Sequence, residues 1–255
     1  MTTPAGARAF FRKRFVAVGT PARAEQEQAY LKSDLRFYGA SVPEIRRASA
    51  DFARAHPDLT RAELRAIVDG LYASGWHDLR SASIALLGSY ANLLRESDLP
   101  WLVRLVRSSD TWAHVDWLAA DIIGGVVERH RGSLRRLPGW AKDESFWVRR
   151  TALLAQLRVL SRGAGDFALF ARLAAGMLDE REFFIRKAIG WILREVSKKR
   201  PRLVYRFLRE HRAAVSSLSL QEGAKYLPAR MRTGLGLPAK AAWRLRDEGM
   251  LDTGN

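Results

Sequence analysis

Apolar residues recur at helical spacing along almost the whole chain, and this periodicity constrains the fold more than any other feature. No segment shows the apolar–polar alternation of a half-buried strand. Gly and Pro residues separate the periodic segments by short connections, which is typical of antiparallel helix pairs. We therefore expect helices near residues 5–18, 22–32, 43–56, 60–73, 78–94, 98–107, 112–130, 134–142, 146–161, 165–177, 181–198, 200–212 and 220–231.

Some of these helix pairs resemble one another. The segment 146–150 (FWVRR) is followed 37 residues later by 183–187 (FFIRK), and 80–82 (RSA) precedes 150–152 (RTA) by 70 residues, although chance remains an alternative for that second match. A spacing near 35–37 residues suits a stacked two-helix repeat. We expect an all-α superhelical solenoid with a concave basic face over residues 1–234. Residues 235–255 are expected to form a loosely ordered tail, apart from a short helix around Trp243.

The charge of the chain is strongly positive. Its 255 residues include 43 Lys and Arg against 27 Asp and Glu, which gives a formal net charge of +16. A polyanionic partner explains this excess, because each cation that neutralises a phosphate also releases condensed counterions. The alternative is an arginine-rich but well-solvated surface, which composition alone does not separate from a binding surface.

Composition excludes several classes of site. The chain has no cysteine, so disulfides, thiolate zinc sites, iron–sulfur clusters and cysteine nucleophiles are ruled out. The five histidines are not closely paired and form no HExxH motif, so we expect neither a metal nor another cofactor. The most apolar stretch, 115–127, is interrupted by Asp116 and Asp121 and is too short to span a membrane. We expect a cytoplasmic protein without a membrane segment, nucleoid-associated if the source is prokaryotic.

The expected helix 181–198 carries two stripes. Its apolar stripe would face the core. A second stripe combines a tryptophan with three cations, at helical spacing: Lys187, Trp191, Arg194 and Lys198. One interpretation is that Trp191 packs on a neighbouring helix beneath the Lys and Arg stems. The other is an aromatic plate within a basic surface that contacts the sugars and phosphates of a nucleic acid.

Basic pairs stand in the first turns of two expected helices: Arg149 and Arg150 in one, Arg186 and Lys187 in the other. The helix dipole disfavours a cation there by about 0.3–1 kcal/mol. A bound phosphate would offset this cost, since helix N-termini and basic side chains both attract anions. The alternative is neutralisation by acids just upstream, which are Asp143, Glu144, Asp179, Glu180 and Glu182.

Trp112 and Asp116 are four residues apart at the start of an expected helix and therefore share a face. Asp116 lies beside the apolar stripe of that helix rather than on it. It can be read as an ordinary first-turn acid that favours the helix dipole. On a surface that binds a polyanion, however, a carboxylate repels phosphate, so it would serve a positive substrate group or a positive transition state.

Four segments resemble, in order, those of the AlkD family of DNA alkylpurine glycosylases. They are 30–39 (YLKSDLRFYG) with Pro43 following, 111–116 (TWAHVD), 146–150 (FWVRR) and 181–195 (REFFIRKAIGWILRE). The last is the most specific, and the resemblance covers roughly residues 8–230. It implies HEAT-like repeats that bind duplex DNA on a concave face and hydrolyse the glycosidic bond of cationic N3- and N7-alkylated purines, without taking the base into a pocket.

The resemblance also implies roles for individual residues. Asp116 matches the catalytic aspartate, and Trp112 and Trp191 match the tryptophans that flank the deoxyribose of the lesion. Arg150 matches an arginine that contacts the DNA backbone, and Arg194 falls at another basic position. With Arg149, Arg186, Lys187 and Lys198, these two arginines are the expected DNA-binding residues.

The chain departs from the family pattern at Thr111, where a tryptophan is usual, and at Ser41, which replaces a glutamine. Both departures bear on lesion range more than on the chemistry. We expect a monomer that acts on alkylated duplex DNA without an obligate protein partner. The alternatives are a non-catalytic nucleic-acid-binding HEAT-repeat protein and a HEAT-type scaffold for an acidic protein.

Overall fold

Local signals in the sequence set where several helices begin. In the computed structural model, which describes residues 3–239, Ser41 caps α3 (Val42–Ala55) and Thr60 caps α4 (Arg61–Tyr72). Each cap is reciprocal, because the carboxylate of Glu44 or Glu63 accepts a hydrogen bond from the backbone N–H of the cap residue. Prolines occupy the first turns of α1 (Pro4–Val18) and α2 (Pro21–Leu31), where their missing N–H costs no hydrogen bond.

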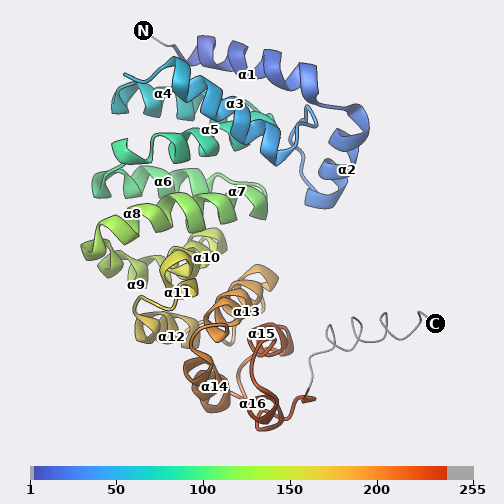
Figure 1. Cartoon of the computed structure of the whole chain (residues 1–255), viewed down its shortest axis with the longest axis vertical. Coiled ribbons are helices and arrows are strands. Elements are labelled where there is room, and N and C mark those ends of the chain that lie inside the picture. Colours follow the sequence, from blue (N-terminus) through green and yellow to red (C-terminus); the bar gives the residue numbers. More distant parts are fainter. Residues whose placement is uncertain (1–2, 240–255) are drawn as a thin grey trace, which may run out of the picture. The chain divides into compact units, whose positions relative to one another are not determined.

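The helices fall into two units, Met1–Leu134 and Arg135–Asn255 (Figure 1). In the first unit, α4 packs against α1 and α5 (His77–Ser89), and α3 also packs against α5. The π-helical segment η3 (Trp117–Ile123) packs against α5 and α6 (Leu99–Arg107). After α4, this unit contains α5 (His77–Ser89), η1 (Ala91–Leu93), η2 (Glu96–Asp98), α6 (Leu99–Arg107), α7 (Trp112–Asp116), η3 (Trp117–Ile123) and α8 (Gly124–Arg129), and η4 (Arg131–Arg136) leads out of it.

The second unit is organised around α13 (Phe183–Ser197), the longest helix among its described residues, which packs against α10 (Phe146–Leu154), α11 (Leu157–Ser161), α14 (Pro201–Glu210) and α15 (Ser217–Gly223). The other helices of this unit are α9 (Leu137–Trp140), α10 (Phe146–Leu154), α11 (Leu157–Ser161), α12 (Phe167–Ala175), α14 (Pro201–Glu210), α15 (Ser217–Gly223) and α16 (Ala229–Thr233).

The predicted all-α class is confirmed. Within residues 3–239 there is no strand, and the sole β contact is an isolated bridge between Arg36 and Trp76. The repeat spacing reappears in the helix starts, because His77, Trp112, Phe146 and Phe183 begin helices at intervals of 35, 34 and 37 residues. No helix in the described part of the chain is both long and apolar enough to cross a membrane.

Five predicted helices differ from the structure. The helix expected at 78–94 ends at Ser89 and is followed by the short η1, and the helix expected at 134–142 is reduced to α9 behind η4. The helix expected at 220–231 is wrong as a single element, because α15 ends at Gly223 and α16 begins only after Pro228. The helix expected at 146–161 is interrupted at Ala155 and Gln156, between α10 and α11. The helix expected at 112–130 is continuous but changes from α to π and back. The tail helix expected around Trp243 lies outside the described residues.

Candidate functional site

Asp116 and Trp112 lie in α7, in the first unit. Thr111 caps this helix, and its hydroxyl oxygen accepts a hydrogen bond from the backbone N–H of Ala113 at 3.3 Å. Val115 is fully buried, whereas Trp112 and Asp116 are both half-buried. The structure therefore places the two predicted residues one helical turn apart, beside the buried stripe, where their side chains remain partly accessible.

A buried histidine between them anchors α7 to α5. The side chain of His114 is fully buried, and its Nε2 lies 3.1 Å from Oγ of Ser81 and 3.3 Å from the carbonyl oxygen of His77. The imidazoles of His77 and His114 stack with their centroids 4.4 Å apart. Burial lowers the pKa of His77 to about 4 and lowers that of His114 well below its usual range, so both rings are neutral at pH 7.

The backbone changes conformation immediately after Asp116. Residues Trp117–Ile123 form a π-helical segment, and the α conformation resumes at Gly124. The π-helix is rare, and π-helical turns within α-helices are frequent at functional sites. Asp116 is thus the last α-helical residue before a change of helical pitch, a feature that apolar periodicity did not predict.

Tyr30, at the end of α2, extends the accessible face of α7. Its ring meets the ring of Trp112 edge to face, with centroids 5.9 Å apart and an interplanar angle of 83°. Tyr30 is 71% exposed. The sequence analysis did not single it out as a site residue, although it opens the first of the four segments that carry the family resemblance.

Trp191 lies in α13, in the second unit, and is half-buried. The residue before it, Gly190, sits against α15 so closely that an added Cβ would lie 2.8 Å from Cβ of Glu222 and 3.1 Å from Cα of Ser219. A reciprocal approach occurs at Gly223, where a Cβ would lie 2.9 Å from Cβ of Leu193. The absence of a side chain at both glycines brings α13 and α15 together and fixes the position of Trp191.

The cations on the basic stripe of α13 are engaged with acids of the same unit. Glu222 pairs with Arg194 through one oxygen and lies 3.8 Å from Nζ of Lys187 through the other. Glu195 pairs with Arg194 at 3.2 Å and with Lys198 at 2.6 Å. Surface ion pairs of this kind contribute little to stability and are screened by salt. The predicted DNA-binding role of these three cations stays a prediction.

The arginines at the two helix starts also have partners within the second unit. Arg149 donates to both carboxylate oxygens of Glu180 at 2.9 and 2.8 Å, and to the carbonyl oxygens of Asp143 and Glu144 at 2.7 and 2.9 Å. Arg186 donates to the carbonyl oxygen of Glu180 at 2.8 Å. Glu180, which lies just before the start of α13, therefore neutralises Arg149 at the start of α10. This ion pair offsets the unfavourable interaction of Arg149 with the dipole of α10.

Arg150 differs from its neighbours because it is 2% exposed. Its guanidinium group donates to the carbonyl oxygen of Phe184 and lies 5.8 Å from the centroid of the Phe184 ring. These contacts tie the start of α10 to the start of α13. These contacts with Phe184 give Arg150 a structural role. The phosphate contact predicted for Arg150 stays a prediction.

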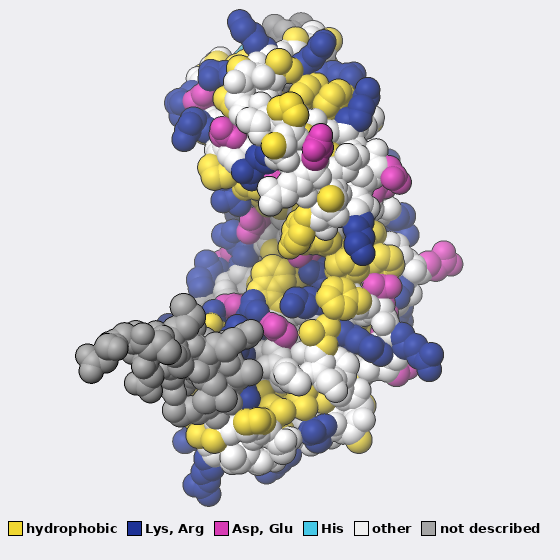
Figure 2. Space-filling model, turned by 90° about the vertical axis from the view of Figure 1, so that its right-hand side faces the viewer, with side chains coloured by type: hydrophobic (Ala, Val, Ile, Leu, Met, Phe, Trp, Pro, Cys, Tyr) yellow, Lys and Arg dark blue, Asp and Glu magenta, His cyan; other side chains and the backbone are white. Residues whose placement is uncertain are grey.

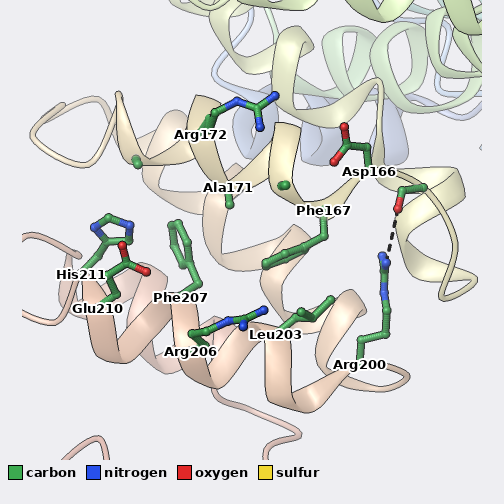
Figure 3. Close-up of a pocket in the computed structure, with 13 residues that line it drawn as sticks. Asp166, Phe167, Ala171, Arg172, Arg200, Leu203, Arg206, Phe207, Glu210 and His211 are labelled. Carbon is green, nitrogen blue, oxygen red and sulfur yellow. Dashed lines mark hydrogen bonds between the residues drawn. The ribbon is translucent and has the colours of Figure 1, made fainter.

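The second unit also holds a cavity of about 570 Å³ between α12 and α14 (Figure 3). Its apolar lining includes Phe167, Leu203 and Phe207, and Arg200 closes one end by donating to the carbonyl oxygens of Ala164 and Gly165. None of the predicted site residues lines this cavity. No cluster of His, Asp and Glu side chains within residues 3–239 is arranged to hold a metal ion.

The distribution of charge is mixed on the face shown in Figure 2. Lys and Arg side chains lie among Asp and Glu side chains there, rather than in one continuous patch. On that face the cations are therefore separate from one another and interspersed with acids.

Comparisons with known proteins agree with the fold. A solved structure described as a predicted DNA alkylation repair enzyme from Enterococcus faecalis is 27% identical, with a TM-score of 0.73, and the match covers 82% of this chain and 97% of that one. AlkD2 from Streptococcus mutans is 18% identical, with a TM-score of 0.60, over 80% of this chain and 99% of that one. At that identity the likeness concerns the fold alone.

A further solved structure, smu.31 from Streptococcus mutans UA159, is 18% identical, with a TM-score of 0.56, over 73% of this chain and 98% of that one. A search of curated proteins finds no match to this chain. The family model described as DNA alkylation repair enzyme matches residues 11–227, which is most of the sequence. The chain therefore belongs to the DNA alkylation repair enzyme family.

Proposed function

We propose that the protein is a DNA glycosylase that hydrolyses the N-glycosidic bond of cationic N3- and N7-alkylated purines in duplex DNA. The observation that carries this proposal is the pair of half-buried side chains in α7, Trp112 and Asp116, in a chain of the DNA alkylation repair enzyme family. The pair stands beside a fully buried stripe and directly before a π-helical segment, so a rigid scaffold presents both groups.

The family resemblance points to cationic alkylated purines, and the limited acid–base chemistry of this pair, which has a single carboxylate, supports that substrate class. Alkylation at N3 or N7 makes the purine cationic, so when the C1′–N bond breaks the base keeps the bonding electrons and leaves as a neutral molecule. No general acid is required at the leaving group. The sugar becomes an oxocarbenium-like cation, and water adds to C1′ and loses a proton. A single carboxylate suffices here, unlike the two that ordinary glycosides need.

Each proposed residue has a role in that step. The carboxylate of Asp116 stabilises the developing positive charge on the sugar and orients water or accepts its proton. The ring face of Trp112, in the first unit, stabilises the same charge through cation–π contact. The family resemblance assigns a role of the same kind to Trp191, in the second unit, and that role stays a prediction. Phosphate contacts are assigned to Arg149, Arg150, Arg186, Lys187, Arg194 and Lys198, which position DNA rather than take part in bond breaking.

The family match supports a role in repair of alkylated DNA and so makes DNA the substrate. We propose that the protein acts as a monomer on duplex DNA, without an obligate protein partner, in the cytoplasm. The proposed reaction leaves an abasic site in the duplex and a free alkylated base in solution, which are two products that can be measured separately.

The direct test is a base-release assay on duplexes that carry a single N3- or N7-alkylated purine of defined size. We expect release of the alkylated base and no release from an undamaged duplex. Series of small and bulky adducts at the same position then define the lesion range. If the protein binds these duplexes but releases no base, the glycosylase proposal fails. The alternative, a non-catalytic nucleic-acid-binding HEAT-repeat protein, is then supported.

A further inference from the structure

A groove of about 480 Å³ lies on the first unit, beside α1 and the segment that follows α2. Three of its lining residues are arginines, Arg8, Arg12 and Arg36, and two are aromatic, Tyr38 and Trp76. The rest of the lining is contributed by small apolar residues of α1, and none of the lining residues is an acid. The groove therefore concentrates positive charge over an apolar floor.

Among residues 3–239, the three arginines have no counter-ion of their own. Within the described part of the chain, no ion pair or side-chain hydrogen bond engages the guanidinium group of Arg8, Arg12 or Arg36, in contrast to the paired cations of α13. Arg8 and Arg12 are one turn apart on the exposed face of α1, where two like charges repel each other. A cluster of unpaired cations at one groove is stabilised when an anion binds.

The aromatic pair holds Arg36 in place. The rings of Tyr38 and Trp76 stack with centroids 3.9 Å apart and an interplanar angle of 10°, and the guanidinium carbon of Arg36 lies 4.6 Å from the centroid of Trp76. Backbone hydrogen bonds of Arg36 to Gly75 and His77 fix the segment further. Trp76 is therefore occupied in positioning a cation rather than left open for a base to stack on it.

A buried acid, Asp78, supports the segment behind the groove through backbone hydrogen bonds, and its negative charge also acts on Tyr38. Asp78 is fully buried, and its two oxygens accept hydrogen bonds from the backbone N–H groups of Tyr38 at 2.9 Å and Ala40 at 2.8 Å. Burial raises the pKa of Tyr38, and the positive charges of Arg12, Arg8 and Arg36 oppose that rise. All three arginines thus act on the Tyr38 hydroxyl, as expected when they face one small volume.

We propose that this groove binds backbone phosphates of DNA, through Arg8, Arg12 and Arg36, as a docking site distinct from Trp112 and Asp116. The chemistry required of the ligand is a phosphate or phosphodiester, since three forked donors converge and a phosphate oxygen accepts several hydrogen bonds at once. The proposal rests on the proposed function in taking DNA as the ligand. It assigns affinity, not bond cleavage, to the groove.

The test compares two variants of the full-length protein that each lose three positive charges from the first unit. The groove variant is Arg8→Gln/Arg12→Gln/Arg36→Gln. The control is Lys13→Gln/Arg47→Gln/Arg104→Gln, whose three residues are exposed and lie outside the groove lining. Thermal unfolding checks that both variants fold. Anisotropy of a labelled, undamaged duplex across a salt series then gives the slope of log affinity against log salt.

Each phosphate contact contributes about 0.9 to that slope. We expect the groove variant to lose about two to three units of slope and the control to lose less than one. Equal slopes for the groove variant and the wild type, or equal losses in both variants, overturn the proposal. A titration with inorganic triphosphate forms the second arm. Weaker triphosphate binding by the groove variant, together with an unchanged DNA slope, would assign the groove to free phosphate and also overturn it.

Base release separates this proposal from the proposed function. Base release by wild-type protein in excess over the duplex is measured in parallel with the salt series. If the wild type releases the alkylated base while the groove variant keeps an unchanged salt slope, the groove proposal fails and the glycosylase assignment stands. If wild-type protein releases no base while the slopes differ as expected, the glycosylase assignment fails and the groove stands.

Discussion

The ring of Tyr30 meets the ring of Trp112 edge to face, 5.9 Å between centroids, although α2 and α7 are far apart in the sequence. Edge-to-face pairs of this geometry are favourable because the positive rim of one ring faces the negative face of the other. Trp112 is only half-buried, so its ring is not held on all sides by the core. Tyr30 is therefore a positioning residue for a tryptophan that we assign to the reacting sugar.

Replacing Tyr30 by Ala is expected to slow base release without unfolding the protein. An aromatic pair contributes about 0.5–1.5 kcal/mol, which corresponds to about a two- to tenfold loss of the single-turnover rate. Tyr30 is 71% exposed, so the melting temperature should stay close to that of the wild type. Tyr30→Phe keeps the ring and is expected to restore the rate. An Ala variant as fast as the wild type would remove Tyr30 from the site.

Asp116→Asn is expected to retain DNA binding and to lose base release by at least about a hundredfold, since it removes the charge that stabilises the sugar cation. The matched control is Asp121→Asn, which makes the same change at an exposed position in η3. Duplex affinity is measured by anisotropy, and release of 7-methylguanine by chromatography. Full release by the Asp116→Asn variant would refute the assignment of Asp116.

Gly190→Ala is expected to destabilise the second unit by about 1–3 kcal/mol, because the new Cβ would overlap Glu222 and the backbone of Ser219 in the contact between α13 and α15. Gly139→Ala provides the control, since an added Cβ in α9 meets no atom within 4 Å. That change should be neutral or stabilise by up to about 1 kcal/mol through helix propensity. Urea unfolding of both variants measures the difference, and equal midpoints would contradict the close contact.

The stacked histidines predict acid destabilisation of the first unit. The pKa of His77 falls to about 4 from the ordinary value of 6.5, mainly because burial disfavours the charged ring. Between those values the unfolded chain binds a proton that the folded chain does not, so stability falls as the pH falls, by about 1.4 kcal/mol per pH unit for each such histidine. Above pH 6.5 the contribution is fully present.

His77→Phe tests this effect, because neither ring nitrogen of His77 has a hydrogen-bond partner within the described residues and the ring stacks on Phe37 at 4.5 Å. Denaturant unfolding at pH 7 and pH 5 should show a smaller loss of stability for the variant than for the wild type. The same loss in both proteins would assign the acid sensitivity to other groups.

Much of the fold could be predicted from periodicity and turn signals, because each helix pair buries one apolar stripe. The starts of α10 and α13 fall at the repeated Phe146 and Phe183. Periodicity and turn signals could not predict where the helices are interrupted or change pitch. The π-helical segment after Asp116 keeps its aliphatic residues buried, and Pro228 separates α15 from α16 within a pattern that still looks helical.

The candidate site could be predicted only in part. Spacing placed Trp112 and Asp116 on one face, and the resemblance gave them roles. Neither could indicate that Arg150 would be buried, since its contacts join helices whose packing is set by the whole unit. The ion pair of Arg149 with Glu180 matches the alternative of neutralisation by an upstream acid, although the acid belongs to the other helix start. The Arg8, Arg12 and Arg36 groove was missed because a turn between helices brings Arg36 to α1.

The buried histidine pair has a further consequence for how the enzyme would be measured. His114 stands between Trp112 and Asp116 and fastens α7 to α5, so protonation of the pair loosens the helix that presents both groups. In a pH–rate profile of base release, an acid limb would then have a structural origin besides any chemical one. Recording the profile for His77→Phe beside the wild type separates the two origins. Removing this histidine shifts only the part of the acid limb that comes from the loosening of α7.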